Sequence, residues 1–158
     1  MNLPNADPRL MLLAGWLSHA LHSDAFTLAP ASEDASFRRY FRVALPEPHA
    51  LAPGAATLIA MDAPPPREDC RPFVRVAALM GAAGVNAPRV LAQDLERGFL
   101  LLTDLGPTTY LRALDADNAN DLFRDAIDTL LRWQLASRPD VLPPYDAALL
   151  RRELELFP

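Results

Sequence analysis

The sequence predicts an α+β fold, in which a small antiparallel sheet with its helices is followed by helices alone. Three observations support this prediction. Hydrophobic spacing indicates a helix, two strands, a helix and two further strands, in that order, before Pro107. No helix intervenes within either pair of strands, which favours antiparallel pairing. After Pro107 the spacing is helical throughout. We therefore expect two units, residues 1–106 and residues 107–158.

The first helix is predicted over residues 8–22. Asp7 can cap its N-terminus, and Pro8 suits the first helical position. Residues 26–31 form a short extended run broken by a proline, and the polar turn Ser32–Ser36 follows. The helix is amphipathic, because apolar residues recur at Leu10, Leu13, Ala14, Leu17 and Leu21.

Residues 37–45 are predicted to form an arginine-rich strand, because aromatic and β-favouring residues dominate them. Alternation places Arg38, Tyr40 and Arg42 together on one face of this strand. Residues 57–61 form its partner strand. The opposite face is expected to turn mainly to the core and carries Phe37, Arg39, Phe41 and Val43.

The second helix is predicted over residues 68–83, with Gly84 as its C-cap. Residues 99–102 are apolar without alternation, so we expect them to be buried on both faces. The other late elements are a hairpin of residues 89–95 and 98–103, a long helix at 118–137 and a last helix capped by Asp146.

The composition excludes several classes of function. The formal net charge is −5, whereas a protein that follows a nucleic-acid backbone needs a basic face. All 15 basic residues are arginine, so this chain cannot supply the lysine that some catalytic mechanisms require. Cys70 is the only cysteine, which excludes a disulfide framework and fits a reducing cytoplasm. We expect no membrane span, and we expect residues 10–21 to be a helix rather than a signal peptide because no basic segment precedes them.

Four segments carry a resemblance to a known family: SEDASFRRYFRV, TLIAMDAPPPREDCRPF, VLAQDLERGFLLLTDLG and WQLASRP. They resemble the N-terminal lobe of the aminoglycoside phosphotransferase and choline kinase branch of the protein-kinase-like fold. Within it they are similar to the amino-sugar kinases of bacterial cell-wall recycling. The resemblance implies an N-lobe at residues 1–106, the first helices of an incomplete C-lobe at residues 107–158, and the use of ATP with Mg²⁺ to phosphorylate the anomeric hydroxyl of N-acetylmuramate or N-acetylglucosamine.

The resemblance implies that this chain corresponds to the N-terminal half of such kinases and lacks their catalytic loop, which lies in the C-lobe. We therefore expect no catalytic residue here and an inactive chain on its own. His22-Ser23-Asp24 resembles the start of a kinase catalytic loop but precedes the first strand. Asp104-Leu105-Gly106 resembles a metal-binding kinase motif, yet no catalytic loop comes before it. The resemblance instead makes Asp104 part of the hinge between lobes.

The nucleotide-binding candidates begin at the polar turn. Ser32, Asp34, Ala35 and Ser36 could cover phosphates with backbone N–H groups and hydroxyls, or they could form an ordinary hairpin turn. The family places a phosphate-binding lysine on the third strand, at or next to Met61 in this chain.

Arg38 or Arg42 could supply the charge that is missing at the lysine position, because guanidinium groups bind phosphate oxygens in a bidentate way. Alternatively, both arginines are solvated or pair with Glu33, Asp34 or Asp62.

Further candidates lie at both sides of the second strand pair. Glu68 and Asp69 could pair with a phosphate-binding arginine, or they could be acidic residues that a helix N-terminus favours. Thr103, Asp104 and Leu105 could contact the adenine edge through their backbone, or they could be an ordinary strand end.

Two other functions remain open from the sequence: a non-catalytic interaction module with a kinase-like N-lobe, and a kinase for another hydroxyl substrate such as an aminoglycoside or choline. The expected partners are a nucleotide and an amino sugar, with no nucleic acid and no membrane. Apolar residues of the last two helices should lie exposed and favour self-association, among them Leu149, Leu150, Leu154 and Phe157.

Overall fold

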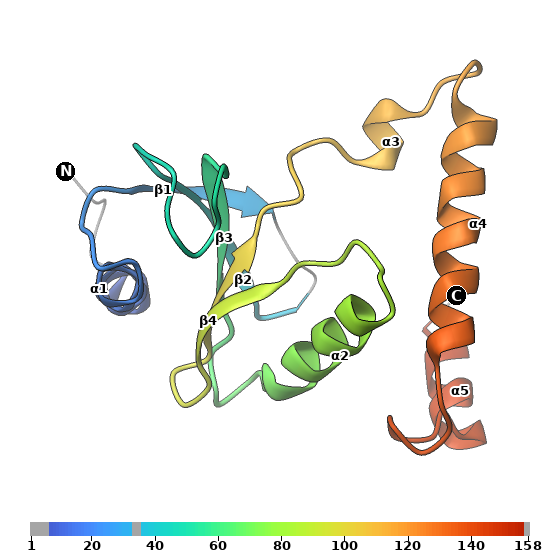
Figure 1. Cartoon of the computed structure of the whole chain (residues 1–158). Helices are drawn as coiled ribbons and strands as arrows, with labels where there is room; N and C mark the ends of the chain where they lie inside the picture. Colours follow the sequence, from blue (N-terminus) through green and yellow to red (C-terminus); the bar gives the residue numbers. More distant parts are fainter. Residues whose placement is uncertain (1–6, 33–35, 157–158) are drawn as a thin grey trace.

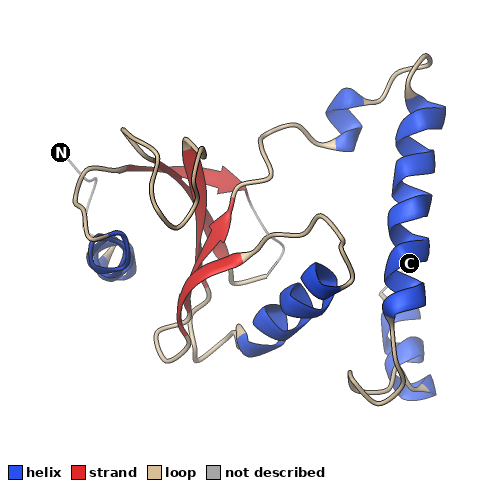
Figure 2. Cartoon of the chain, in the orientation of Figure 1, coloured by secondary structure: helices blue, strands red, loops and turns tan. Residues whose placement is uncertain are grey.

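The computed structural model describes residues 7–32 and 36–156. Its elements are α1 (Pro8–Leu21), β1 (Thr27–Ser32), β2 (Arg39–Ala44), β3 (Thr57–Asp62), α2 (Arg71–Ala82), β4 (Val90–Asp94), β5 (Phe99–Thr103), α3 (Tyr110–Ala113), α4 (Ala119–Ala136) and α5 (Ala147–Leu154). The five strands form one sheet in the order β1-β2-β3-β5-β4, and every neighbouring pair is antiparallel. Figures 1 and 2 show α1 on one side of this sheet and α2 on the other. The predicted α+β class is confirmed.

Two apolar cores lie on the two faces of the sheet. On the α1 face, the buried side chains of that helix pack against Val43, Leu58, Ala60 and Leu101. On the α2 face, Met61, Leu100 and Leu102 pack with Cys70, and residues of α2 cover them. Every residue from Phe99 to Leu102 is buried, as the uninterrupted apolar run predicted.

The first helix forms as predicted. The Oδ1 of Asp7 accepts hydrogen bonds from the N–H groups of Arg9 at 3.0 Å and Leu10 at 3.2 Å, which satisfies two donors of the first turn. Pro8 occupies the first turn, and the helix ends at His22, whose φ is 48°.

Three predicted boundaries were wrong. Ser32 ends β1 and pairs with Tyr40, so it is not the first residue of the turn. The extended run before it is a full edge strand. β2 begins only at Arg39, and α2 begins at Arg71, so Glu68 and Asp69 precede the helix instead of opening it. Pro72 at the start of α2 fits this later beginning, because proline is tolerated only in the first turn of a helix.

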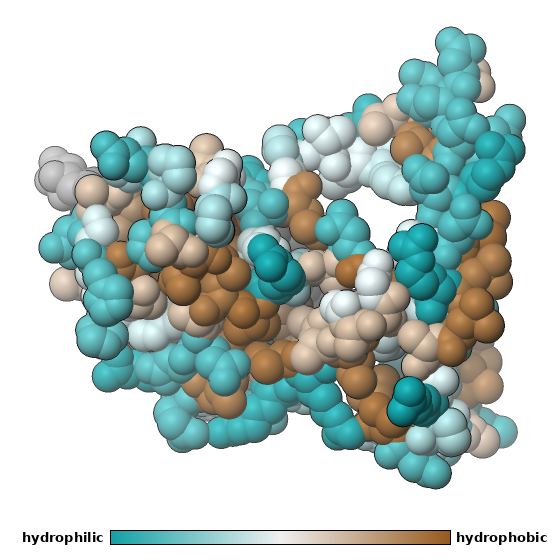
Figure 3. Space-filling view, viewed as in Figure 1, coloured by the Kyte–Doolittle hydropathy of each residue, from teal (hydrophilic) through white to brown (hydrophobic). Residues whose placement is uncertain are grey.

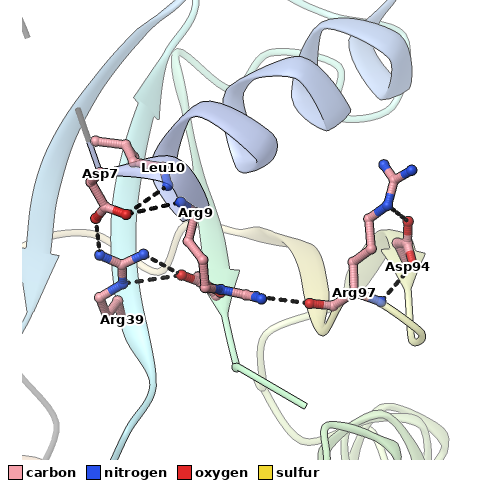
Figure 4. Close-up of polar contacts among 7 residues, drawn as sticks. Asp7, Arg9, Leu10, Arg39, Asp94 and Arg97 are labelled. Carbon is pink, nitrogen blue, oxygen red and sulfur yellow. Dashed lines mark hydrogen bonds and ion pairs between the residues drawn. The ribbon is translucent and has the colours of Figure 1, made fainter. Parts of the chain in front are cut away.

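A buried carboxylate fastens α1 to the sheet. Asp62 is 0% exposed, and its two oxygens accept from Arg9 Nε at 2.9 Å and Arg39 Nε at 3.0 Å. Arg39 also forms an ion pair with the helix cap Asp7, and Arg9 Nη2 donates to the carbonyl of Arg97 at 2.8 Å. Figure 4 shows Arg9 and Arg39 converging from α1 and β2. Arg39 thus lies on the predicted core face, and the carboxylates of Asp62 and Asp7 compensate its charge.

The C-terminal helices lie beyond α2 (Figure 1). Arg132 of α4 donates to the carbonyl of Gly84 at 3.4 Å, and Arg75 of α2 donates to the carbonyl of Val141. No residue of α4 or α5 that the structure describes is buried. Hydrophobic residues line the outer side of α4 in Figure 3. None of the described helices has the length and apolar character to cross a bilayer.

Candidate functional site

The candidate site is a cleft on the α2 face of the sheet, with a volume of about 370 Å³. It lies where β5 runs into the segment that leaves the sheet. β2 and β3 supply Tyr40, Arg42 and Ile59, and α2 supplies Phe73. The residues from β5 onward that line it are Leu102, Thr103, Asp104, Leu105, Gly106, Pro107 and Thr109. The walls are mainly apolar with a few polar groups, which is the usual character of a small-molecule site.

Asp104 organises one end of this cleft. Arg42 donates to it through Nε at 2.6 Å and through Nη2 at 3.2 Å. The hydroxyl of Thr57 donates to Oδ2 at 2.8 Å, and the N–H of Gly106 donates to Oδ1 at 2.8 Å. The side chain of Asp104 is only 5% exposed. One carboxylate therefore joins β2, β3 and the exit of β5.

The charges of this pair are stable at neutral pH. The hydrogen bond from Arg42 lowers the pKa of Asp104 below its ordinary value of 3.8, although desolvation opposes this. The same bond raises the pKa of the Arg42 guanidinium. Both groups are therefore ionised at neutral pH, and together they carry no net charge.

A second ion pair lies at the opposite end of β2. Arg38 Nε donates to Glu68 Oε2 at 3.1 Å, and the backbone N–H of Phe37 donates to Glu68 Oε1 at 3.1 Å. The guanidinium of Arg67 lies 4.7 Å from the centre of the Phe37 ring. The residues before α2 therefore hold the start of β2, just after the polar turn.

Burial lowers the pKa of Arg38, but hydrogen bonding to Tyr40 and the charge of Glu68 outweigh it, so the net shift is upward. Arg38 also lines a groove of about 270 Å³ beside α2. Phe73 and Pro88 line both this groove and the cleft, so the two hollows adjoin at these residues.

The structure brings several predicted residues together. Arg42, Thr103, Asp104 and Leu105 all line the cleft, and Arg38 lines the adjoining groove. Neither Arg38 nor Arg42 pairs with Asp62. The oxygens of Asp62 accept from Arg9 and Arg39 on the α1 face of the sheet.

Other predicted residues lie elsewhere. Met61 is fully buried in the core beneath α2 and is not among the residues that line the cleft. Ser36 lies beside the start of β2, where its Oγ accepts from the N–H of Arg38 at 3.2 Å. Ser32 is the last residue of β1. Asp34 and Ala35 lie outside the described residues.

Sequence reasoning missed the roles of Ile59 and Thr57. The period of two along β3 places Ile59 on the same face as Met61, so alternation could have identified it as a lining residue. The hydrogen bond of Thr57 depends on a partner 47 residues away. No local pattern in the sequence indicates that contact.

Chemically, the cleft offers apolar walls for a flat ring and strand-end backbone groups for its edge. The adjoining groove adds a guanidinium that an anion could approach. A different hollow of about 390 Å³ lies between residues 24–27 and 44–46, but among the described residues that line it, Asp24 is the only charged one. Its charge opposes a polyanionic ligand. Among the residues that the structure describes, no three His, Cys, Asp or Glu side chains gather as a metal site.

Comparison with known proteins gives a consistent result. The sequence profile described as "Phosphotransferase enzyme family" matches residues 27–158. The N-acetylmuramate/N-acetylglucosamine kinase of Pseudomonas aeruginosa is 53% identical over 151 residues, which are 96% of this chain and 41% of that protein. The kinase of the same name from Pseudomonas putida is 50% identical over 166 residues, with 99% and 47% covered. That of Neisseria meningitidis is 37% identical over 154 residues, with 95% and 43% covered. The chain thus spans less than half the length of these curated relatives.

Proposed function

We propose, because this chain belongs to the phosphotransferase enzyme family, that it is the nucleotide-binding part of an ATP-dependent amino-sugar kinase. The acceptors would be N-acetylmuramate and N-acetylglucosamine, as the names of the relatives indicate. The reaction would belong to the recycling of cell-wall sugars in the cytoplasm, where ATP is present. The amino sugar would bind mostly to a part of the kinase that this chain does not contain.

The cleft beside Asp104 is the observation that carries the proposal. Its floor and walls are apolar at Ile59, Leu102 and Leu105, which suits the two faces of an adenine ring. Thr103 at the end of β5 and Leu105 just after it border the cleft. The N–H of Thr103 already donates to the carbonyl of Arg89, so the backbone of Leu105 is the group that could pair with the edge of the base. Residues 1–106 would form the nucleotide lobe, and residues 107–158 would begin a helical lobe.

Mg²⁺ would enter this site with the nucleotide, because it binds through phosphate oxygens and retains several waters. When bound, it would supply positive charge beside the transferred phosphoryl group. The role of this chain is to orient the base and to hold the phosphates in line for transfer.

Titration of the purified chain with ATP tests the proposal directly. We expect saturable binding of ATP in the presence of Mg²⁺, and no release of ADP when N-acetylmuramate is added. A chimaera that joins this chain to the remaining part of the Pseudomonas putida kinase is expected to phosphorylate the sugar. Substitution of Leu105 by Asp in the chimaera should weaken ATP binding, because it places a second carboxylate, next to that of Asp104, where the adenine ring would bind.

Two results would contradict the proposal. Absence of nucleotide binding, together with tight binding of a protein partner, would favour a non-catalytic interaction module. Turnover of ATP by the chain alone with the sugar would show that it needs no second part. A chimaera that phosphorylated an aminoglycoside or choline in preference to the sugar would assign another acceptor.

A further inference from the structure

We propose that two arginines on the α2 face of the sheet, Arg38 just before β2 and Arg42 within it, serve opposite ends of the nucleotide. Arg38, held by Glu68, binds the phosphates, whereas Arg42, held by Asp104, positions the segment that receives the base. This inference rests on the proposed function and assigns a separate task to each ion pair. Arg38 is then the ligand-contacting residue, and Arg42 is a positioning residue that acts through Asp104.

The spacing of the two arginines fits one ligand. They are four residues apart, Arg38 directly before β2 and Arg42 within it, so at the rise of an extended chain their Cα atoms are about 13 Å apart. This length is comparable with that of an extended nucleoside triphosphate from its base to its last phosphate. Arg42 lies at the end of the strand nearest Asp104, and Arg38 lies at the end nearest the polar turn. The strand therefore spans the ligand from end to end.

Arg42 is committed to Asp104. It uses two nitrogens on one carboxylate, at 2.6 and 3.2 Å, and that carboxylate is almost completely buried. If Arg42 turned to a phosphate, Asp104 would remain in the protein as a buried and uncompensated charge, which is costly. The other two donors to Asp104, Thr57 and Gly106, are neutral and cannot replace the cation. Arg42 therefore fixes the backbone from Asp104 to Gly106.

Arg38 has a different arrangement. Its contact with Glu68 uses Nε, and it also forms a hydrogen bond with Tyr40. Because the guanidinium has five N–H donors in all, donors remain with which it can hold an anion beside the carboxylate. Glu68 also accepts from the N–H of Phe37, which fixes the backbone beside Arg38. The adjoining groove gives a ligand access to this side chain.

The Arg38–Glu68 pair brings to this face the two charges that kinases place on a strand lysine and a helix glutamate. In this chain the strand position at or next to that of the kinase lysine carries Met61, which is buried and uncharged. The cation has moved to the neighbouring strand, and the carboxylate lies just before α2 instead of within it. A long guanidinium on β2 can cover the distance that this change introduces.

The experiment measures the dissociation constants of ATP and of adenosine for the 158-residue chain and its variants, with Mg²⁺ present. Arg38→Met is expected to weaken ATP binding by roughly tenfold to a hundredfold, because a charge-assisted contact is lost, and to leave adenosine binding unchanged. Arg38→Lys should recover part of the loss, and Glu68→Gln should show a smaller loss of the same kind. Arg42→Met should weaken ATP and adenosine alike.

Arg71→Met is the matched control, because Arg71 is an exposed arginine near the same segment whose contacts are Asp69 and Glu96. Its ratio of ATP to adenosine affinity should equal that of the unchanged chain. Circular dichroism verifies that each variant is folded, and the affinity ratio is independent of the folded fraction. An unaltered ratio in both Arg38 variants would overturn the assignment of Arg38, and a selective loss of ATP in Arg42→Met would reverse the two roles. Absence of nucleotide binding by the unchanged chain would instead overturn the proposed function, and this inference with it.

Discussion

Gly98 occupies a position where the fold has no room for a side chain. Its φ is 73°, and a Cβ built there would lie 1.8 Å from the carbonyl oxygen of Ala63. The carbonyl of Gly98 also accepts from the N–H of Ala63 at 2.8 Å, so the two backbones cannot separate without losing that hydrogen bond. The turn between β4 and β5 is thereby locked to the end of β3.

We expect Gly98→Ala to lower the free energy of unfolding by about 3 kcal/mol, from backbone strain and the loss of this contact. Urea denaturation measures it. Gly54→Ala is the control, because Gly54 has a φ of 82° but open space around its Cβ position, and it should cost only about 1–2 kcal/mol. Equal losses for the two variants would show that the Ala63 contact contributes nothing.

Single residues also mark the limit of what the sequence could predict about the site. The face shared by Arg38, Tyr40 and Arg42 follows from alternation, and the structure confirms that they share a face. Glu68 was one of two acidic residues suggested as a partner for such an arginine, and it pairs with Arg38 from 30 residues along the chain. The pairing of Arg42 with Asp104 could not be predicted, because the two residues are 62 positions apart. Only the assembled sheet brings these carboxylates to the arginines.

At the scale of elements, hydrophobic periodicity predicted the order of helices and strands up to β5, except for β1, and it predicted the long helix α4. The run that forms β1 was expected only as a short extended segment broken by a proline. The predicted start of α2 was wrong. Glu68 accepts hydrogen bonds from Phe37 and Arg38, and these contacts compete with a helical first turn at this residue. Hydrophobic periodicity also missed the short helix α3, whose one turn is too brief for a period to be recognised.

The attachment of α1 to the sheet depends on Asp62. Asp62→Asn removes the charge that two arginines share, and their side chains are 30% and 38% exposed, so solvent compensates them in part. We expect the free energy of unfolding to fall by about 2–3 kcal/mol, measured by urea denaturation. Hydrogen exchange should show faster opening of α1 than of α2.

Asp94→Asn is the control for this prediction. Asp94 pairs with Arg97 at 3.7 Å on the surface, as Figure 4 shows, and Asn can still accept from the N–H of Arg97. The change should be within about 0.5 kcal/mol. If both substitutions had this small effect, packing alone would hold α1 in place.

At the scale of the whole molecule, the main feature is the uncovered stripe of α4. Phe123, Ile127, Leu131 and Leu135 recur every four residues and are between 49% and 87% exposed. Apolar surface of this extent is unusual on a monomer. The sequence predicted exposure in the last two helices, and Leu150 and Leu154 are indeed exposed. Leu149 is instead half-buried, and Phe157 lies outside the described residues.

We expect the chain to associate reversibly through this stripe, with a sedimentation coefficient that rises with protein concentration. Leu131→Glu should shift the chain toward the monomer, because it places a charge in the centre of the contact. Ala136→Glu introduces the same charge on the opposite side of α4 and should leave association unchanged. A monomer at every concentration, with no binding of an apolar dye, would contradict this prediction.

The neighbouring arginines at the start of β2 constrain how the gene can change. Arg38 and Arg39 point to opposite faces of the sheet, one toward Glu68 and the other toward Asp62. Loss of a single codon within the strand would exchange these faces, and each arginine would meet the partner of the other. The connection of residues 45–56 carries no such alternation, so a change in its length leaves the faces of the strand in place, provided that its core residue Ala52 is kept. Insertions and deletions among homologous genes should accordingly fall in that connection and be absent from the strand.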